Sequence, residues 1–156
     1  MEKPARTWTW LAVILCVIAV IPGHVVGGVA EYLFRLSIPQ GMLPDPLSLH
    51  FLFGIDWLAK PLAWIFVVGL ASAIRGGVAG AIAVAVTRCL CRRANILKAA
   101  IVTGTVYTVV VVLAFIVSLF TIGIDSDAVA SVLELIGLWI GLFSVAATAP
   151  QFEPSK

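Results

Sequence analysis

Four long apolar stretches take up most of this chain and decide which folds are open to it. They cover residues 8–27, 61–86, 99–122 and 128–148. A helix needs about 20 apolar residues to cross about 30 Å of hydrocarbon, and each stretch meets that length. Strands are excluded as spans because an open sheet leaves backbone polar groups unpaired in lipid. The sequence therefore predicts an all-α, polytopic membrane protein: one four-transmembrane-helix bundle in contact with the lipid bilayer.

Composition supports the same class of protein. Hydrophobic residues make up 62% of the chain and charged residues 12%. A typical soluble domain has about 45–50% apolar and about 25% charged residues. We expect no nucleic-acid partner, and we find no serine–histidine–acid set or phosphate-binding glycine motif that would indicate an enzyme.

The distribution of charge predicts the orientation in the membrane. Lys3 and Arg6 precede the first span, and the loop 87–98 contains Arg88, Arg92, Arg93 and Lys98. In the connections 28–60 and 123–127, most of the charged side chains are acidic. Because Lys and Arg in short loops favour the cytoplasmic side, both termini and loop 87–98 are predicted to be cytoplasmic. The membrane is then the cell membrane, or the inner membrane in a bacterium, and the basic loop either binds anionic lipid or only fixes the orientation.

Two further interpretations concern the first span and the loop after it. Residues 1–30 also resemble a cleavable secretory signal, but the apolar region continues past Val20 and is longer than a typical signal core. The outer loop 28–60 contains several prolines and an apolar segment, 48–57, that we expect to lie at the membrane interface.

The second span carries small residues at helical spacing. One row, four residues apart, consists of Gly69, Ala73, Gly77, Ala81 and Ala85, and an adjacent row consists of Ser72, Gly76 and Gly80. Small residues let helix backbones approach closely in lipid. These rows predict that the second span is the central packing helix. Whether they also form a seam with a second copy or with a larger membrane complex is left open.

Arg75 lies between those rows, near the predicted middle of the bilayer. Because a lipid-facing arginine at that depth costs several kcal/mol or more, its side chain should face protein or water. At about 1.5 Å per residue, Arg75 is about 18 Å above the cytoplasmic edge, level with Val20 and Val110. Glu134 is shallower, about 10 Å below the outer edge on the same rise. An Arg75–Glu134 pair would need tilt or a bridging water, and a Ser131–Glu134 capping box is the competing interpretation.

The remaining polar candidates within the spans are His24, Tyr107 and Thr108. His24 and His50 both fall in the outer half, where two histidines could bind haem iron. His50 follows a proline-rich turn, however, so no cofactor and no metal site are expected.

These features favour a small structural or accessory subunit that packs against a partner, or against itself, through the small-residue ridge of the second span. The alternative is a small transporter or ion pathway in which Arg75 and Glu134 line a polar cavity. A membrane enzyme acting on lipid or quinone is a third interpretation, for which no catalytic residue can be named.

Overall fold

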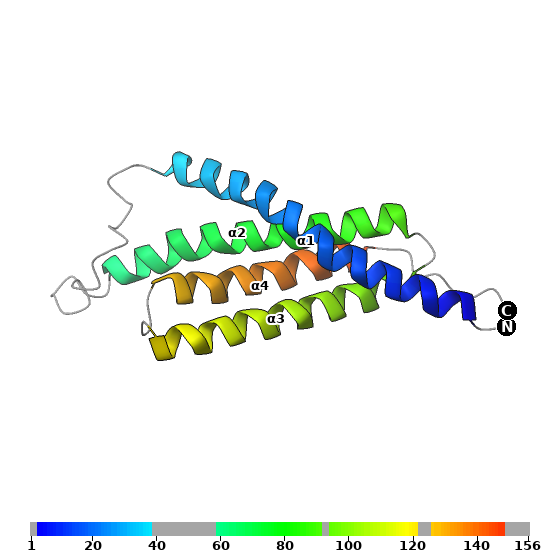
Figure 1. Cartoon of the computed structure of the whole chain (residues 1–156). Coiled ribbons are helices and arrows are strands. Elements are labelled where there is room, and N and C mark those ends of the chain that lie inside the picture. The colour runs from blue at the N-terminus through cyan, green and yellow to red at the C-terminus, as the bar shows by residue number, and fades with distance from the viewer. Residues whose placement is uncertain (1–2, 39–58, 92–93, 122–125, 149–156) are drawn as a thin grey trace.

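The computed structural model describes residues 3–38, 59–91, 94–121 and 126–148, and in these ranges it contains four helices and no strand (Figure 1). The helices are α1 (Lys3–Ser37), α2 (Ala59–Leu90), α3 (Ile96–Thr121) and α4 (Ser126–Ala147). Each is long and apolar enough to cross a membrane. The predicted fold class, an all-α four-helix membrane bundle, is confirmed.

Helix α1 is longer than its predicted span. It continues past residue 27 to Ser37, so the first ten residues of the predicted outer loop 28–60 are helical. An ion pair between Glu31 and Arg35, one helical turn apart, stabilises this extension. The Ser37 hydroxyl donates a hydrogen bond to the Phe34 carbonyl at the helix end. The predicted interfacial segment 48–57 and His50 lie outside the described residues.

The connection between α2 and α3 is shorter than the predicted loop 87–98. Helix α2 ends at Leu90 and α3 begins at Ile96, because the Asn95 side chain accepts a hydrogen bond from the Lys98 amide and caps α3. Arg88 and Lys98 are therefore helical residues, while Arg92 and Arg93 lie outside the described residues.

The bundle has two ends that differ in which helix termini they hold (Figure 1). The Lys3 end contains the start of α1, the end of α2, the start of α3 and the end of α4. The Ser37 end contains the opposite termini. Helix α2 packs most extensively against α4 and α1, whereas α3 packs mainly on α4 and α1. As the sequence predicts, α2 is the central packing helix. Toward the Ser37 end, α1 diverges from the other three helices, and we call the region where its side chains face α2 and α4 the wedge (Figure 1).

The seam between α2 and α4 is formed by glycines whose backbones touch. A methyl group at Gly76 would meet the Glu134 carbonyl, and one at Gly80 would meet the Leu138 carbonyl. Conversely, a methyl group at Gly137 would meet the Ala73 carbonyl, and one at Gly141 the Gly77 carbonyl. Two small-xxx-small motifs therefore fit into each other, with α2 and α4 running in parallel.

Helix α1 approaches α2 through a third glycine pair. Added methyl groups at Gly23 and Gly27 would meet the backbones of Ala79 and Arg75, respectively. The residue numbers rise on α1 as they fall on α2, so these two helices are antiparallel. This contact brings α1 against the backbone of Arg75 itself.

The apolar core lies in the half of the bundle near the Lys3 end. Its residues are mostly small, and the largest fully buried side chains in it are those of Leu138, Leu142 and Val84. Much of the outward surface of α3 is apolar and exposed, as a lipid-facing helix requires. The core therefore fixes the helices at one end and leaves the other end to polar groups.

Candidate functional site

Five ionisable side chains form a continuous series of contacts in the wedge between α1, α2 and α4. Arg35 Nη2 lies 2.6 Å from Glu31 Oε1, and Arg75 Nη1 lies 3.8 Å from Glu31 Oε2. Arg75 Nε lies 3.5 Å from Glu134 Oε1, and His24 Nδ1 lies 3.0 Å from that same oxygen. Basic and acidic groups alternate along the series. We call these five residues, Arg35, Glu31, Arg75, Glu134 and His24, the ion chain.

Helical periodicity puts three members of the ion chain on one stripe of α1. His24, Glu31 and Arg35 are separated by seven and four residues, and Gly27 lies on the same stripe. Since Gly27 packs on the backbone of Arg75, this stripe faces α2. A small residue at position 27 thus lets α1 approach closely enough for Glu31 to reach Arg75.

The glycine seam brings the other two members together. Arg75 precedes Gly76 on α2, and the backbone of Gly76 packs against the Glu134 carbonyl on α4. The residues at which α2 and α4 pack most tightly therefore also fix the separation between guanidinium and carboxylate.

The contacts around Arg75 are loose. Its two ion pairs are 3.5 and 3.8 Å long, beyond the usual hydrogen-bond range. Its Nε atom is buried without a hydrogen-bond partner among the described residues, while the side chain as a whole is 42% exposed. The Arg75 side chain is therefore loosely held and partly accessible.

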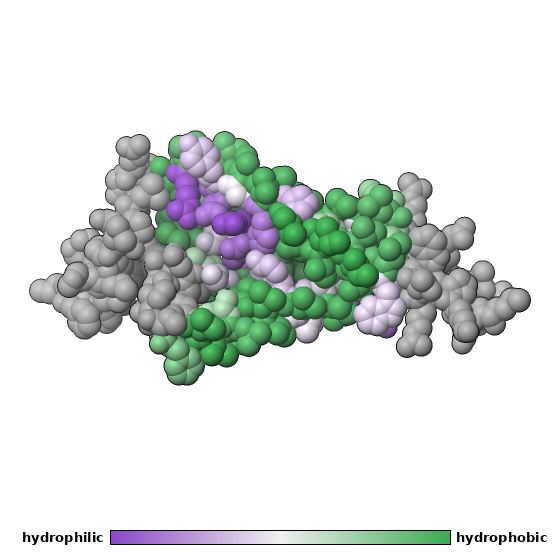
Figure 2. All heavy atoms as spheres, in the orientation of Figure 1, coloured by the Kyte–Doolittle hydropathy of each residue, from purple (hydrophilic) through white to green (hydrophobic). Residues whose placement is uncertain are grey.

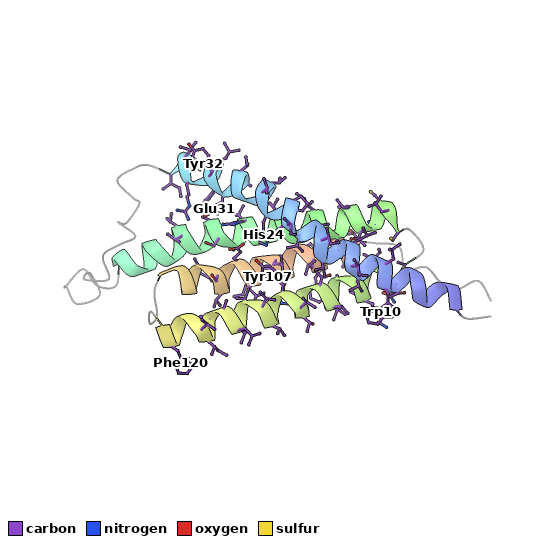
Figure 3. All side chains as sticks on the ribbon, viewed as in Figure 1. Trp10, His24, Glu31, Tyr32, Tyr107 and Phe120 are labelled. Atoms are coloured by element: carbon purple, nitrogen blue, oxygen red, sulfur yellow. The ribbon has the colours of Figure 1, made fainter. Side chains whose placement is uncertain are left out.

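His24 is the most enclosed basic group of the ion chain, with 18% of its side chain exposed. Its Nδ1 atom is close to Glu134, but the pair lacks hydrogen-bond alignment. Within the described part of the chain, both ring nitrogens are buried without a hydrogen-bond partner. Tyr107 from α3 stacks on the imidazole, with the ring centroids 5.4 Å apart (Figure 3). Helices α3 and α4 thus each contribute a side chain that contacts this histidine of α1.

Thr108 lies beside Tyr107 in sequence but has a different role. Its hydroxyl donates to the Gly104 carbonyl and accepts a hydrogen bond from Trp139 Nε1. The Trp139 ring also packs where a side chain on Gly104 would sit. Thr108 therefore belongs to the seam between α3 and α4 and not to the ion chain.

The capping-box interpretation of Glu134 is wrong. Helix α4 begins at Ser126, so Ser131 is already inside the helix and cannot cap it. Glu134 is an interior residue whose carboxylate contacts Arg75 and His24.

The relative heights predicted for Arg75, Glu134 and Val20 are wrong, because the ends of the apolar stretches are not at one height. Seventeen residues separate Gly76 from the start of α2 at Ala59, whereas eight separate Glu134 from the start of α4 at Ser126. Helix α2 therefore extends past α4 at the Ser37 end (Figure 1). On α1, Arg75 is level with Gly27 and not with Val20.

The small-residue ridge of α2 is used largely within the chain. Ala73, Gly76, Gly77 and Gly80 contact α4, and the Ala81 backbone lies close to Gly141. A methyl group at Gly69 would meet the Leu133 side chain on α4. Ala85 is exposed. Most residues of the two predicted rows thus take part in internal packing, while Ala73, Gly77 and Ala81 are only partly buried.

The predicted basic loop is only partly described. Arg88 is partly buried at the end of α2, and Lys98 is exposed in the first turn of α3. Nearby, Cys89 is exposed and Cys91 is buried, and both are free thiols.

Sequence reasoning missed Glu31 and Arg35 as members of the site, because both were assigned to a loop. The spacing 24, 27, 31, 35 is the signal that identifies them: it continues one helical stripe beyond the apolar stretch. The Gly137-xxx-Gly141 motif on α4 could also have been found, since it repeats the spacing recognised on α2.

The ion chain reaches the surface of the bundle. A hydrophilic patch lies on one face near the Ser37 end, surrounded by apolar side chains (Figure 2). With His24 neutral, two arginines balance two glutamates, so the ion chain carries no net charge. Carboxylate and imidazole groups can exchange protons, while guanidinium groups stay charged. Among the described residues, no group of three His, Cys, Asp or Glu side chains is arranged to hold a metal ion.

Comparisons of the chain with protein-family models, with curated proteins and with solved structures give no match. The site therefore has to be interpreted from its own geometry. That geometry belongs to a small multi-pass membrane protein with a polar, charged cluster inside one half of its helix bundle.

Proposed function

We propose that the protein is a small transporter or ion pathway, and that the ion chain lines the part of its route that opens at the Ser37 end. The observation that carries this proposal is the unbroken alternation of five ionisable groups from the end of α1 to the interior of the bundle. Ionisable residues at membrane depth are costly and commonly mark ion or substrate routes.

The looseness of the ion chain supports transport over a purely structural role. A cluster that only held helices together would gain most from short, aligned hydrogen bonds. Arg75 instead makes two long contacts, and neither ring nitrogen of His24 has a hydrogen-bond partner among the residues that the structure describes. Such groups can bind a passing ion or proton without first breaking a strong bond.

The Lys3 half of the bundle is closed by its apolar core. Transport would then require a second arrangement in which this core opens, as alternating access demands. In this proposal the route would open first toward the Ser37 end, where the ion chain lies and which the charge distribution predicts to be the outer side.

Flux measurements in liposomes test this proposal. The purified protein is reconstituted, and proton, chloride and potassium fluxes are followed separately with ion-specific dyes. We expect flux of at least one ion in the parent protein, at least a tenfold loss in Arg75→Leu, and unchanged flux in Lys98→Gln. The control also removes one positive charge, but it lies on exposed surface outside the ion chain. Absence of any flux in the parent, or unchanged flux in Arg75→Leu, would refute the proposal.

An accessory subunit is the second candidate function, and a specific observation favours it. The Arg75 and Arg35 side chains are 42% and 43% exposed, so an acidic residue on a partner helix could pair with them. This role predicts that the protein purifies in mild detergent with one partner at fixed stoichiometry, and that Arg75→Leu releases that partner. Recovery as a monodisperse single species would count against it.

A further inference from the structure

We propose that His24 is the proton-binding residue of the ion chain, and that its protonation draws the Glu134 carboxylate away from Arg75. This inference rests on the proposed function and specifies the ion as the proton. It concerns one imidazole, one carboxylate oxygen and one guanidinium, contributed by α1, α4 and α2.

The other members of the ion chain are poor proton acceptors. Arg35 and Arg75 keep their protons at every relevant pH. Both oxygens of Glu31 are engaged, Oε1 by Arg35 at 2.6 Å and Oε2 by Arg75 at 3.8 Å. Glu134 Oε1 is in contact with both Arg75 and His24. His24 alone can gain a positive charge in the physiological pH range.

The ring nitrogens of His24 are available for an incoming proton. A neutral imidazole has one N–H group and one nitrogen with a lone pair, and neither nitrogen has a hydrogen-bond partner among the described residues. A hydronium ion arriving along the wedge transfers its proton to the lone-pair nitrogen and leaves as water. The ring becomes an imidazolium, and the net charge of the ion chain rises from zero to plus one.

Among the described residues around His24, one carboxylate, that of Glu134, is close enough to compensate that charge. On α1 itself, Glu31 and Arg35 are already paired with each other. Helix α2 contributes Arg75, α3 contributes Tyr107, stacked on the ring, and α4 contributes Glu134, 3.0 Å from Nδ1. The new charge is therefore attracted to Glu134.

Arg75 and His24 compete for the same oxygen. Glu134 Oε1 lies 3.5 Å from Arg75 Nε and 3.0 Å from His24 Nδ1, and neither contact is an aligned hydrogen bond. A small rotation of the carboxylate toward the imidazolium completes a charge-assisted hydrogen bond with His24 and lengthens the contact with Arg75. Arg75 then keeps only Glu31 as its ionic partner. Protonation at α1 is thus transmitted to the guanidinium on α2.

Nitrogen-15 NMR on the full chain in lipid nanodiscs tests this inference directly. The protein has two histidines, so His50→Gln leaves His24 as the only labelled imidazole. We expect its ring nitrogens to change from the neutral to the imidazolium pattern between about pH 8 and about pH 5. The Arg75 Nε resonance should shift with the same midpoint.

Two outcomes would overturn the inference. One is a His24 ring that stays neutral throughout this range. The other is a His24 titration that leaves the Arg75 Nε resonance unmoved. In Glu134→Gln the Arg75 shift should vanish, while Tyr107→Phe, which keeps the stacked ring, should preserve it. This readout does not depend on transport: flux without His24 titration would mean that the ion is not the proton, and titration without flux would refute only the proposed function.

Discussion

The two halves of this bundle are built on opposite principles. Near the Lys3 end, small apolar residues fill the core and the helices are held by close packing. Near the Ser37 end, α1 diverges and five ionisable side chains occupy the wedge, where Arg35 and Glu31 form a short hydrogen bond but the contacts of Arg75 are long (Figure 1). Between them lie the glycines that bring α1, α2 and α4 together. We therefore expect close packing to contribute most of the stability of the bundle and the ion chain to contribute a smaller part.

Substituting Gly76 should have the largest effect on stability, because a larger side chain there disrupts the α2–α4 seam that lies between the two halves. In Gly76→Val the new side chain would overlap the Glu134 backbone, and we expect a loss of about 3 kcal/mol in the free energy of unfolding. Steric-trapping measurements in bicelles can determine this loss. Gly28→Val is the control, since a methyl group at Gly28 meets nothing within 4 Å. Equal losses in both variants would mean that the seam does not stabilise the bundle.

Removing the Glu134 carboxylate should have the next largest effect. Glu134→Leu leaves Arg75 and His24 without the carboxylate that they share, and we expect the free energy of unfolding to fall by about 2 kcal/mol. This loss is smaller than that for a fully buried ion pair, because the Arg75 side chain is 42% exposed. The same unfolding assay measures it. Lys98→Gln should change stability by less than about 0.5 kcal/mol. A Glu134→Leu variant as stable as the parent would show that the ion chain contributes nothing to stability.

Two neighbouring glycines, Gly27 and Gly28, test the contact between α1 and α2 that lies between the two halves. Gly27→Ala places a methyl group against the Arg75 carbonyl and should cost about 1–2 kcal/mol, whereas Gly28→Ala should change stability by less than about 0.5 kcal/mol. Gly27→Ala should also lengthen the distance between spin labels placed on α1 and α2 at the Ser37 end. If the two variants behave alike, α1 does not rest on α2 at position 27.

The smallest effect is expected at the seam between α3 and α4. Thr108→Val removes the acceptor for Trp139 Nε1 and should cost about 0.6 kcal/mol, a typical value for a hydrogen bond between membrane helices. The indole N–H resonance of Trp139 should move at the same time. Thr105→Val is the matched control, because the exposed Thr105 hydroxyl bonds only to the Ile101 carbonyl in its own helix. If the indole resonance also moves in Thr105→Val, its shift in Thr108→Val does not report the loss of the hydrogen bond between Trp139 and Thr108.

The fold class was predictable because length and hydrophobicity are properties of single segments. Each apolar stretch is long enough to be recognised without knowing its neighbours. The role of α2 was predictable too, since small residues four apart have one main use in lipid.

The site was only partly predictable, because it depends on relative heights that no single segment encodes. Arg75, Glu134, His24 and Tyr107 could be singled out as polar residues within apolar stretches. Their contacts could not be derived, since α2 extends past α4 and α1 continues to Ser37. Counting from assumed edges therefore separated Arg75 from Glu134. Glu31 and Arg35 were not predicted as site residues for a similar reason: a charged helical turn that follows an apolar stretch has the composition of a loop.

The length of α1 links the wedge to the thickness of the surrounding bilayer. Its candidate membrane span, Thr9–Ser37, which includes the charged Glu31 and Arg35, covers 29 residues, about 44 Å at 1.5 Å per residue, against about 30 Å of hydrocarbon. Such an excess is relieved mainly by tilt, and a thinner bilayer demands more of it. Because α1 rests on α2 at Gly23 and Gly27, a change in tilt swings Glu31 and Arg35 relative to Arg75. The length of the lipid chains should therefore change the distances from Glu31 and Arg35 to Arg75.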